Sequence, residues 1–202
     1  FLMDMGNQTV SALLSSLSAK QPTPGGGTVA GLLAALSTAL GQMVIVYSQG
    51  KKKFAEHEAI HHDCMAFLES ASAESLALGN ADADAYEALN ALWKLEKNDP
   101  KRISDWDNTL ATAINIPLQT IKLSKRILET LEILSDKTNA FLSSDLVIAA
   151  ILADASARSA RLNVEINVSQ MVKGELRTAI QEETSALCAS CKTICTSIED
   201  AL

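Results

Sequence analysis

The sequence predicts an all-α protein, a single domain built as a bundle of long helices. Apolar residues recur at helical spacing, and no repeat, linker or low-complexity tract divides residues 1–202. Only nine glycines and four prolines interrupt a chain rich in Ala and Leu, which are strong helix formers. The chain is 48% hydrophobic but only 4% aromatic, so its core must consist largely of Ala, Leu, Ile and Val. Its length suits one domain with a substantial core.

The first two predicted helices cover about residues 9–19 and 28–47. The loop between them, Gln21-Pro22-Thr23-Pro24-Gly25-Gly26-Gly27, cannot continue a helix, and Thr28 is placed to cap the helix that follows. That second helix carries bulky apolar residues on one side and small residues on the other. We therefore expect it to be buried all round, at the centre of the fold or at a subunit interface.

The second helix is also the segment that most resembles a membrane span. It contains Ser37, Thr38 and Gln42, and it is short for a bilayer, so a buried helix of a soluble bundle fits it better. The start of the chain lacks a basic stretch followed by an apolar one, as a secretory signal would have. We expect a cytoplasmic protein with no membrane partner.

Four further helices are expected downstream. Gly79-Asn80 could break the long third helix, Pro117 should kink the fourth, and Ser143-Ser144-Asp145 should cap the fifth. Residues 162–168 alternate like a strand, but no partner strand exists, so we interpret them as helical or irregular. The predicted helices cover about residues 53–95, 104–134, 146–161 and 169–200.

The formal net charge of −7 argues against a nucleic-acid partner, which would need a basic face. The Gly-rich loop offers free backbone N–H groups at a helix N-terminus, and Lys51, Lys52 and Lys53 follow at the far end of the same helix. Together they suggest an anionic small molecule as ligand. The loop is not a nucleotide P-loop, because no Lys or Ser/Thr follows at the required spacing. By composition alone, a flexible turn between helices is the favoured interpretation.

Asp82 is the candidate acid. On a helix it shares a face with Leu78, Ala85, Tyr86, Leu89 and Trp93, which are apolar or aromatic. A carboxylate there is desolvated, so its pKa should rise toward the range useful for acid–base chemistry. Asp84 points elsewhere and should be solvated. The alternative interpretation makes Asp82 an N-cap that follows Gly79-Asn80.

Two other groups of residues could bind a metal, and for both we favour another interpretation. His57 and His61 are four residues apart, but acidic neighbours suggest a solvated surface. Cys188, Cys191 and Cys195 lie along one side of a helix, where they read as a packing stripe of reduced thiols. We expect no metal. Asn163 and Asn167, one helical turn apart, could present amides to a heterocycle or serve as caps.

Five motifs, in this order, resemble the formiminotetrahydrofolate cyclodeaminase family. They are Pro24-Gly25-Gly26-Gly27-Thr28-Val29, Gly50-Lys51-Lys52-Lys53-Phe54, Asp82-Ala83-Asp84-Ala85-Tyr86, Ser144-Asp145-Leu146 and Leu162-Asn163-Val164-Glu165-Ile166-Asn167. The resemblance spans nearly the whole chain. The family includes the cyclodeaminase half of a bifunctional formiminotransferase-cyclodeaminase and stand-alone bacterial relatives, some of them methenyltetrahydrofolate cyclohydrolases. The resemblance implies an all-helical homodimer with folate bound in a cleft near the Gly-rich loop.

The resemblance also implies roles for particular residues. Asp82 matches the catalytic aspartate of the family pattern Asp-x-x-Ala-aromatic, although relatives often have Glu and Phe where this chain has Asp84 and Tyr86. The substrate-binding set that it implies is Pro24, Gly25, Gly26, Gly27, Lys51, Lys52, Lys53, Asn163 and Asn167. The lysines and loop N–H groups would hold folate carboxylates or the pterin oxygen, and the asparagines would contact the pterin.

The expected reaction converts 5-formiminotetrahydrofolate to 5,10-methenyltetrahydrofolate with release of ammonia, and it needs no cofactor because no electrons move. The same pocket could instead serve a methenyltetrahydrofolate cyclohydrolase that gives 10-formyltetrahydrofolate. A non-catalytic helical protein that binds folate or a partner is the third possibility. The carboxylate on an apolar face argues against it, because an inert bundle would gain from an apolar residue there.

Overall fold

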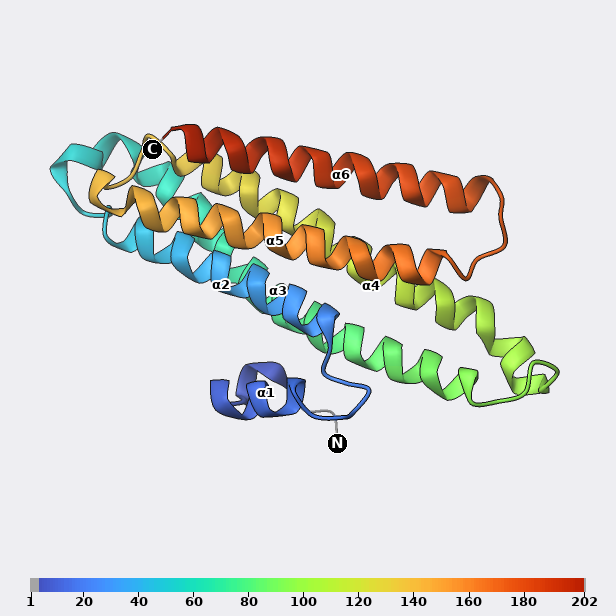
Figure 1. The fold of residues 1–202 in the computed structure, drawn as a ribbon. Helices are drawn as coiled ribbons and strands as arrows, with labels where there is room; N and C mark the ends of the chain where they lie inside the picture. The colour runs from blue at the N-terminus through green and yellow to red at the C-terminus, as the bar shows by residue number, and fades with distance from the viewer. Residues whose placement is uncertain (1–3, 202) are drawn as a thin grey trace.

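Five long helices pack along one another and form an elongated bundle, while the short α1 lies to one side (Figure 1). The computed structural model describes residues 4–201, which contain no strand. The elements are η1 (Met5–Asn7), α1 (Val10–Leu17), α2 (Gly26–Val46), η2 (Lys52–His57), α3 (Glu58–Trp93), α4 (Pro100–Leu134), η3 (Ala140–Leu142), α5 (Ser143–Val168) and α6 (Glu175–Asp200). The predicted all-α single domain is confirmed.

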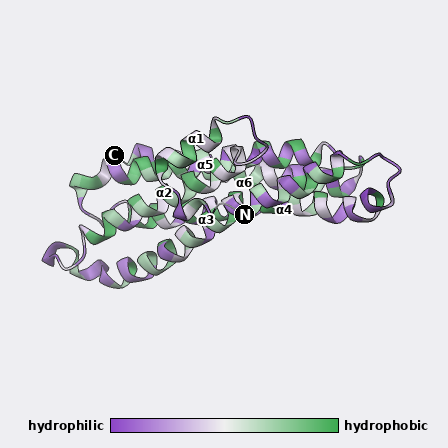
Figure 2. Ribbon diagram, turned by 90° about the horizontal axis from the view of Figure 1, so that it is seen from below, coloured by the Kyte–Doolittle hydropathy of each residue, from purple (hydrophilic) through white to green (hydrophobic). Residues whose placement is uncertain are grey.

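The core lies around α5, which packs against α2, α4 and α6. Its inward side is made of alanines, which let the neighbouring helices approach closely: Ala149, Ala150, Ala153, Ala157 and Ala160, all fully buried. Leu and Ile side chains from α3 and α4 make up much of the rest of the core, as the composition predicted, and apolar residues of α2, α5 and α6 complete it. Apolar and polar residues are interspersed around the helices rather than separated into different segments (Figure 2).

The two sides of α2 differ in burial within one chain, so the helix does not lie at the centre of the fold, and its place at a subunit interface stays a prediction. Its small residues face the bundle, whereas Leu36, Val46 and Tyr47 on the other side are 46%, 60% and 57% exposed. By length and hydropathy, α2 and the segment 140–168 could each cross a membrane. Half of the most apolar part of α2 is nevertheless buried inside the bundle, and core helices have the same composition.

The first turns of α2 lie directly on the middle of α3. A Cβ atom added at Gly31 would lie 2.6 Å from the Ser75 carbonyl oxygen and 2.8 Å from the Gly79 Cα atom. The Thr28 hydroxyl donates a hydrogen bond to the Gly79 carbonyl at 3.3 Å. Gly79 therefore serves close helix packing, and α3 continues through it without the break that the sequence suggested.

This contact gives a stability prediction. In Gly31→Ala the new methyl group meets backbone atoms, which cannot move aside as a side chain would. We expect a loss of about 2–3 kcal/mol in the free energy of unfolding, measured by urea denaturation. Gly174→Ala is the control, because a Cβ atom at Gly174 meets nothing within 4 Å. Equal stability losses in the two variants would contradict the prediction.

Several helix boundaries differ from those predicted. α2 begins at Gly26 with Gly25 as its N-cap, so Thr28 already lies in the first turn and does not cap the helix. α5 continues through residues 162–168 to Val168, and residues 169–174 form the loop to α6. As predicted, by contrast, α4 continues on both sides of Pro117. Tertiary packing outweighs the local signals at these positions.

Candidate functional site

The Asp82 carboxyl group lies directly against the backbone of Gly27, in the first turn of α2. A Cβ atom added at Gly27 would lie 1.9 Å from Asp82 Oδ2 and 2.3 Å from Oδ1, so only glycine leaves room for the carboxylate. On the other side, a Cβ atom at Gly26 would lie 3.7 Å from Asn163 Oδ1. Side chains from α3 and α5 therefore meet at the N-terminus of α2.

Burial makes Asp82 a weak acid. It lies in the middle of α3, which runs from Glu58 to Trp93, so the alternative of an N-cap is wrong. Its side chain is half-buried, and desolvation raises its pKa from 3.8 to about 6. Asp84 is exposed, as expected. Desolvation and, to a lesser extent, the nearby Glu87 raise its pKa as well. Asp82 can therefore hold a proton close to neutral pH.

Asp82 lines a cavity of about 410 Å³ between α3, α4 and α5. The other lining residues are Ala85, Tyr86, Leu89, Trp93, Ala113, Asn163, Ile166, Asn167, Ser169 and Gln170. The cavity thus contains one titratable carboxyl group, several amides and two aromatic rings, with the Tyr86 and Trp93 ring centroids 6.0 Å apart, edge to face. A mostly apolar wall with a few polar groups is typical of a site for an organic ligand.

The structure places both predicted asparagines in this cavity. Asn167 Nδ2 donates to the Ala113 carbonyl at 2.7 Å, which fixes the orientation of its amide. Asn163 Nδ2 is buried and has no hydrogen-bond partner among the residues that the structure describes. A buried donor without a partner is costly, so a ligand acceptor at this point would satisfy it.

Sequence reasoning placed Tyr86 and Trp93 on the face of Asp82 but did not assign them to a site. Their helical spacing was the signal that could have done so. Gln170 was missed, because it lies in the loop after α5, and no pattern indicated that Trp93 Nε1 donates to its Oε1 atom at 3.1 Å.

The predicted loop residues face more than one environment. Gly27 is buried against Asp82, whereas Gly26 is exposed and Gly25 has open space around its Cα atom. Pro24 lines a second cavity of about 350 Å³ on the side of α1, together with Asp84 and Glu87. This cavity is acidic, which makes it a poor site for the carboxylates of an anionic ligand.

Within one chain, the lysines lie far from Asp82. Lys51 precedes η2 and Lys52 and Lys53 begin it, beyond the C-terminal end of α2, and all three are exposed. The 21 residues of α2 span about 30 Å. Gly27 and the three lysines therefore lie at opposite ends of α2 within one chain.

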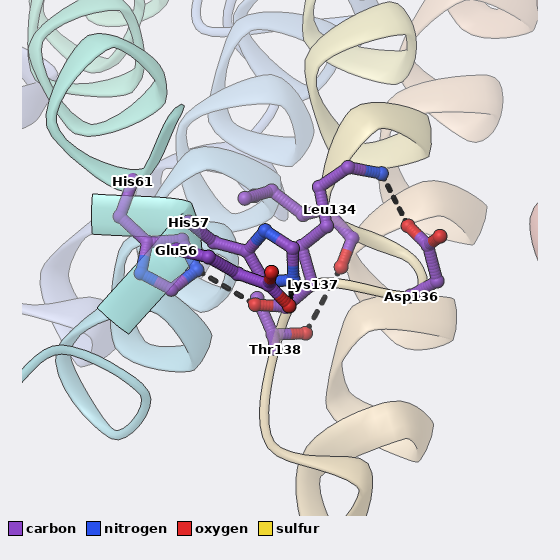
Figure 3. Close-up of polar contacts among 7 residues, drawn as sticks. All are labelled: Glu56, His57, His61, Leu134, Asp136, Lys137 and Thr138. Carbon is purple, nitrogen blue, oxygen red and sulfur yellow. Dashed lines mark hydrogen bonds and ion pairs between the residues drawn. The ribbon is translucent and has the colours of Figure 1, made fainter. Parts of the chain in front are cut away.

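The histidines, near these lysines, hold loops together and are not all on the surface. His61 is fully buried, and its Nε2 atom lies 2.7 Å from the Lys137 carbonyl, to which it donates (Figure 3). His57 lies beside it and contacts Glu56 at 3.6 Å (Figure 3). The expectation of a solvated cluster is thus wrong for His61. The His61 contact joins the start of α3 to the segment between α4 and α5.

The cysteines are packed in the core. Cys188, Cys191 and Cys195 are buried free thiols where α6 meets the bundle, and burial raises the pKa of Cys191 to about 12 and that of Cys195 to about 11. They are therefore protonated at neutral pH and pack as small apolar side chains. In the part of the chain that the structure describes, no three His, Cys, Asp or Glu residues are arranged to hold a metal ion.

Comparison with known proteins relates the chain, with its cavity lined by Asp82, to a protein family. The sequence model of the formiminotransferase-cyclodeaminase family matches residues 9–186. The chain belongs to this family. The resemblance drawn from the five motifs is thereby confirmed.

Other family members differ in length and in the activity after which they are named. The chain is 32% identical over 166 residues to a methenyltetrahydrofolate cyclohydrolase of Methylorubrum extorquens, covering 80% of each protein. It is 27% identical over 187 residues to the formimidoyltransferase-cyclodeaminase of Gallus gallus, covering 91% of this chain but only 35% of that protein.

A solved structure shows the same fold. The crystal structure of formiminotetrahydrofolate cyclodeaminase from Thermotoga maritima superposes with a TM-score of 0.88 at 25% sequence identity. The match covers 98% of this chain and 96% of the other, so the whole helical bundle is shared.

Proposed function

We propose that this protein is an enzyme of folate one-carbon metabolism that converts 5-formiminotetrahydrofolate to 5,10-methenyltetrahydrofolate and ammonia. One observation carries the assignment: a carboxyl group with a pKa of about 6 lies at the wall of an amide-lined cavity, against a glycine that leaves room for it. The name of the Thermotoga maritima structure supports this choice of reaction.

The chemistry needs one well-placed proton donor. N10 of the folate attacks the formimino carbon attached to N5, and the carbon–nitrogen bond to the departing amine then breaks. The amine leaves as ammonia only after it has gained a proton, which Asp82 can supply because burial raises its pKa to about 6, so that a fraction of it carries a proton near neutral pH. Asn163, Asn167 and the N–H groups of the Gly-rich loop would hold the substrate. The reaction moves no electrons and needs no cofactor, and we place it in the cytoplasm.

Methenyltetrahydrofolate cyclohydrolase is the second candidate activity. The Methylorubrum extorquens relative carries that name and matches over 80% of both proteins. Incubating the purified protein with each substrate separates the two activities. Methenyl absorbance should rise with the formimino substrate if the first assignment holds, and loss of the methenyl compound should accelerate if the second does. A folate that binds but is never converted would favour the non-catalytic alternative.

The raised pKa of Asp82 gives a pH prediction for the deaminase reaction. The acid must be protonated to act, and its protonated fraction falls as the pH rises through about 6. We therefore expect kcat/KM to decline about tenfold per pH unit above that value, measured between pH 5 and 8. A profile that rises up to about pH 6 and then levels off would show that the group acts as a base.

We further propose that the protein is a homodimer in which a second copy supplies the lysines. The outward side of α2 is apolar and continues onto α5, where Ile148, Ile151 and Leu162 are exposed. A two-fold axis near the middle of α2 would pair these faces antiparallel and bring Lys51, Lys52 and Lys53 of one copy toward the Gly-rich loop of the other. That arrangement would offset the 30 Å separation within one chain.

Mixing two inactive variants tests the shared site. If an Asp82→Asn copy pairs with a copy in which all three lysines are alanine, one of the two sites in the mixed dimer is intact. Activity should then return to about a quarter of the wild-type value after the subunits exchange. No recovery, with dimers confirmed by light scattering, would place the whole site within one chain.

A further inference from the structure

Two of the amides that line the cavity have fixed orientations. Trp93 Nε1–H can only donate, so the atom of Gln170 that accepts its hydrogen bond at 3.1 Å must be the carbonyl oxygen. The Ala113 carbonyl can only accept, so the atom of Asn167 at 2.7 Å must be the amide nitrogen. Neither assignment depends on which way an isolated amide would be drawn.

The remaining half of each amide is free for a ligand. Gln170 retains its NH₂ group, and Asn167 retains its carbonyl oxygen, with no hydrogen-bond partner for either within residues 4–201. Both residues line the cavity. In addition to the Asn163 Nδ2 group, which has no partner among the described residues, these two amides therefore present a donor and an acceptor beside the aromatic rings of Tyr86 and Trp93.

We propose that Gln170, held by Trp93, and Asn167 determine specificity by recognising the lactam edge of an oxo-heterocycle. This inference rests on the proposed function and deepens it. A 2-amino-4-oxopteridine presents an oxygen acceptor at C4 beside an N3–H donor. The Gln170 NH₂ group would donate to the oxygen, and the Asn167 carbonyl would accept from N3–H. A 4-amino analogue reverses both groups, so it meets a donor with a donor and an acceptor with an acceptor.

The role of Trp93 is to position Gln170. Without the indole N–H, the Gln170 amide could rotate and present either of its ends to the ligand. Trp93→Phe keeps an aromatic ring in the cavity but removes that donor. Gln170→Glu keeps the bond from Trp93 but replaces the free NH₂ group with a carboxylate oxygen, which can only accept.

The test compares the binding of folic acid with that of its 4-amino analogue, aminopterin, by isothermal titration calorimetry at pH 7.5. The wild-type protein should prefer folic acid by tenfold or more, and Trp93→Phe should reduce that preference about tenfold. Gln170→Glu should reverse it in favour of the 4-amino compound. Trp106→Phe, a matched change in a tryptophan that does not line this cavity, should leave the preference unchanged.

A structural role alone would weaken both ligands equally and leave their ratio unchanged. An unaltered ratio in Trp93→Phe and Gln170→Glu would therefore overturn the inference, as would a wild-type protein that does not distinguish the two ligands. If folate substrates are still converted in that case, the proposed function stands. A wild-type protein that neither binds nor converts any folate would overturn both.

Discussion

Asp82→Asn is expected to lower kcat by about 10²–10⁴-fold, because the amide cannot supply the proton that the departing amine needs. Asparagine has nearly the same shape, so it should still fit against Gly27 and leave the fold intact. Folic acid binding should change little. The measurement is the initial rate of methenyl formation from the formimino substrate, together with calorimetric binding of folic acid.

Asp84→Asn provides the matched control for this variant. It makes the same chemical change two residues away on the same helix, at an exposed carboxylate that does not line the cavity of Asp82. Its turnover should stay within about threefold of wild type, since surface substitutions away from a site have small effects. Full turnover in Asp82→Asn would remove Asp82 from the role of acid.

Gly27→Ala is expected to lower turnover by about 10²-fold, even though it removes no polar group from the site. The new methyl group would occupy the position of the Asp82 carboxyl, since the built Cβ atom lies 1.9 Å from Oδ2. The carboxyl group must then move away from the reacting nitrogen, and displacements of about 1 Å are enough for a loss of this size. The rate of methenyl formation measures it.

Gly26→Ala is the comparison that isolates this contact. A Cβ atom there would meet only Asn163 Oδ1, at an ordinary contact distance of 3.7 Å. Its turnover should remain much closer to that of the wild type, and circular dichroism should show the same helix content in both variants. Equal losses in Gly26→Ala and Gly27→Ala would mean that backbone flexibility at the start of α2, rather than the Asp82 contact, controls the rate.

The helical class could be predicted because the signals for it are local. Helical periodicity and composition indicated the long helices, and the apolar neighbours of Asp82 on its own helix predicted its raised pKa. Asn163 and Asn167 were placed together by their spacing of one helical turn. All of these inferences use residues within a single helix.

The errors came from contacts between helices. Gly79 was interpreted as a break in α3, but it is the point where α2 approaches most closely, which local propensity cannot show. Thr28 was interpreted as a cap, but its hydroxyl bonds to α3. His61 was interpreted as solvated, but it is buried and bonds to the Lys137 carbonyl. That contact joins residues 76 positions apart, which no local pattern shows. The role of the lysines stays a prediction, because α2 separates them from Asp82 within one chain and only a second copy could bring them close to it.

The close contact of Gly31 with Gly79 also limits how the length of this protein can vary. Gly27 lies one turn before Gly31 on α2, and Asp82 lies nearly one turn after Gly79 on α3. The Gly31–Gly79 and Gly27–Asp82 contacts are therefore consecutive contacts between the same two helices. Inserting or deleting a residue between these two contacts, on either helix, would rotate Gly27 or Asp82 by about 100° around its helix axis. The carboxyl group would then no longer face Gly27. Length changes should be confined to loops remote from these two contacts, such as residues 169–174.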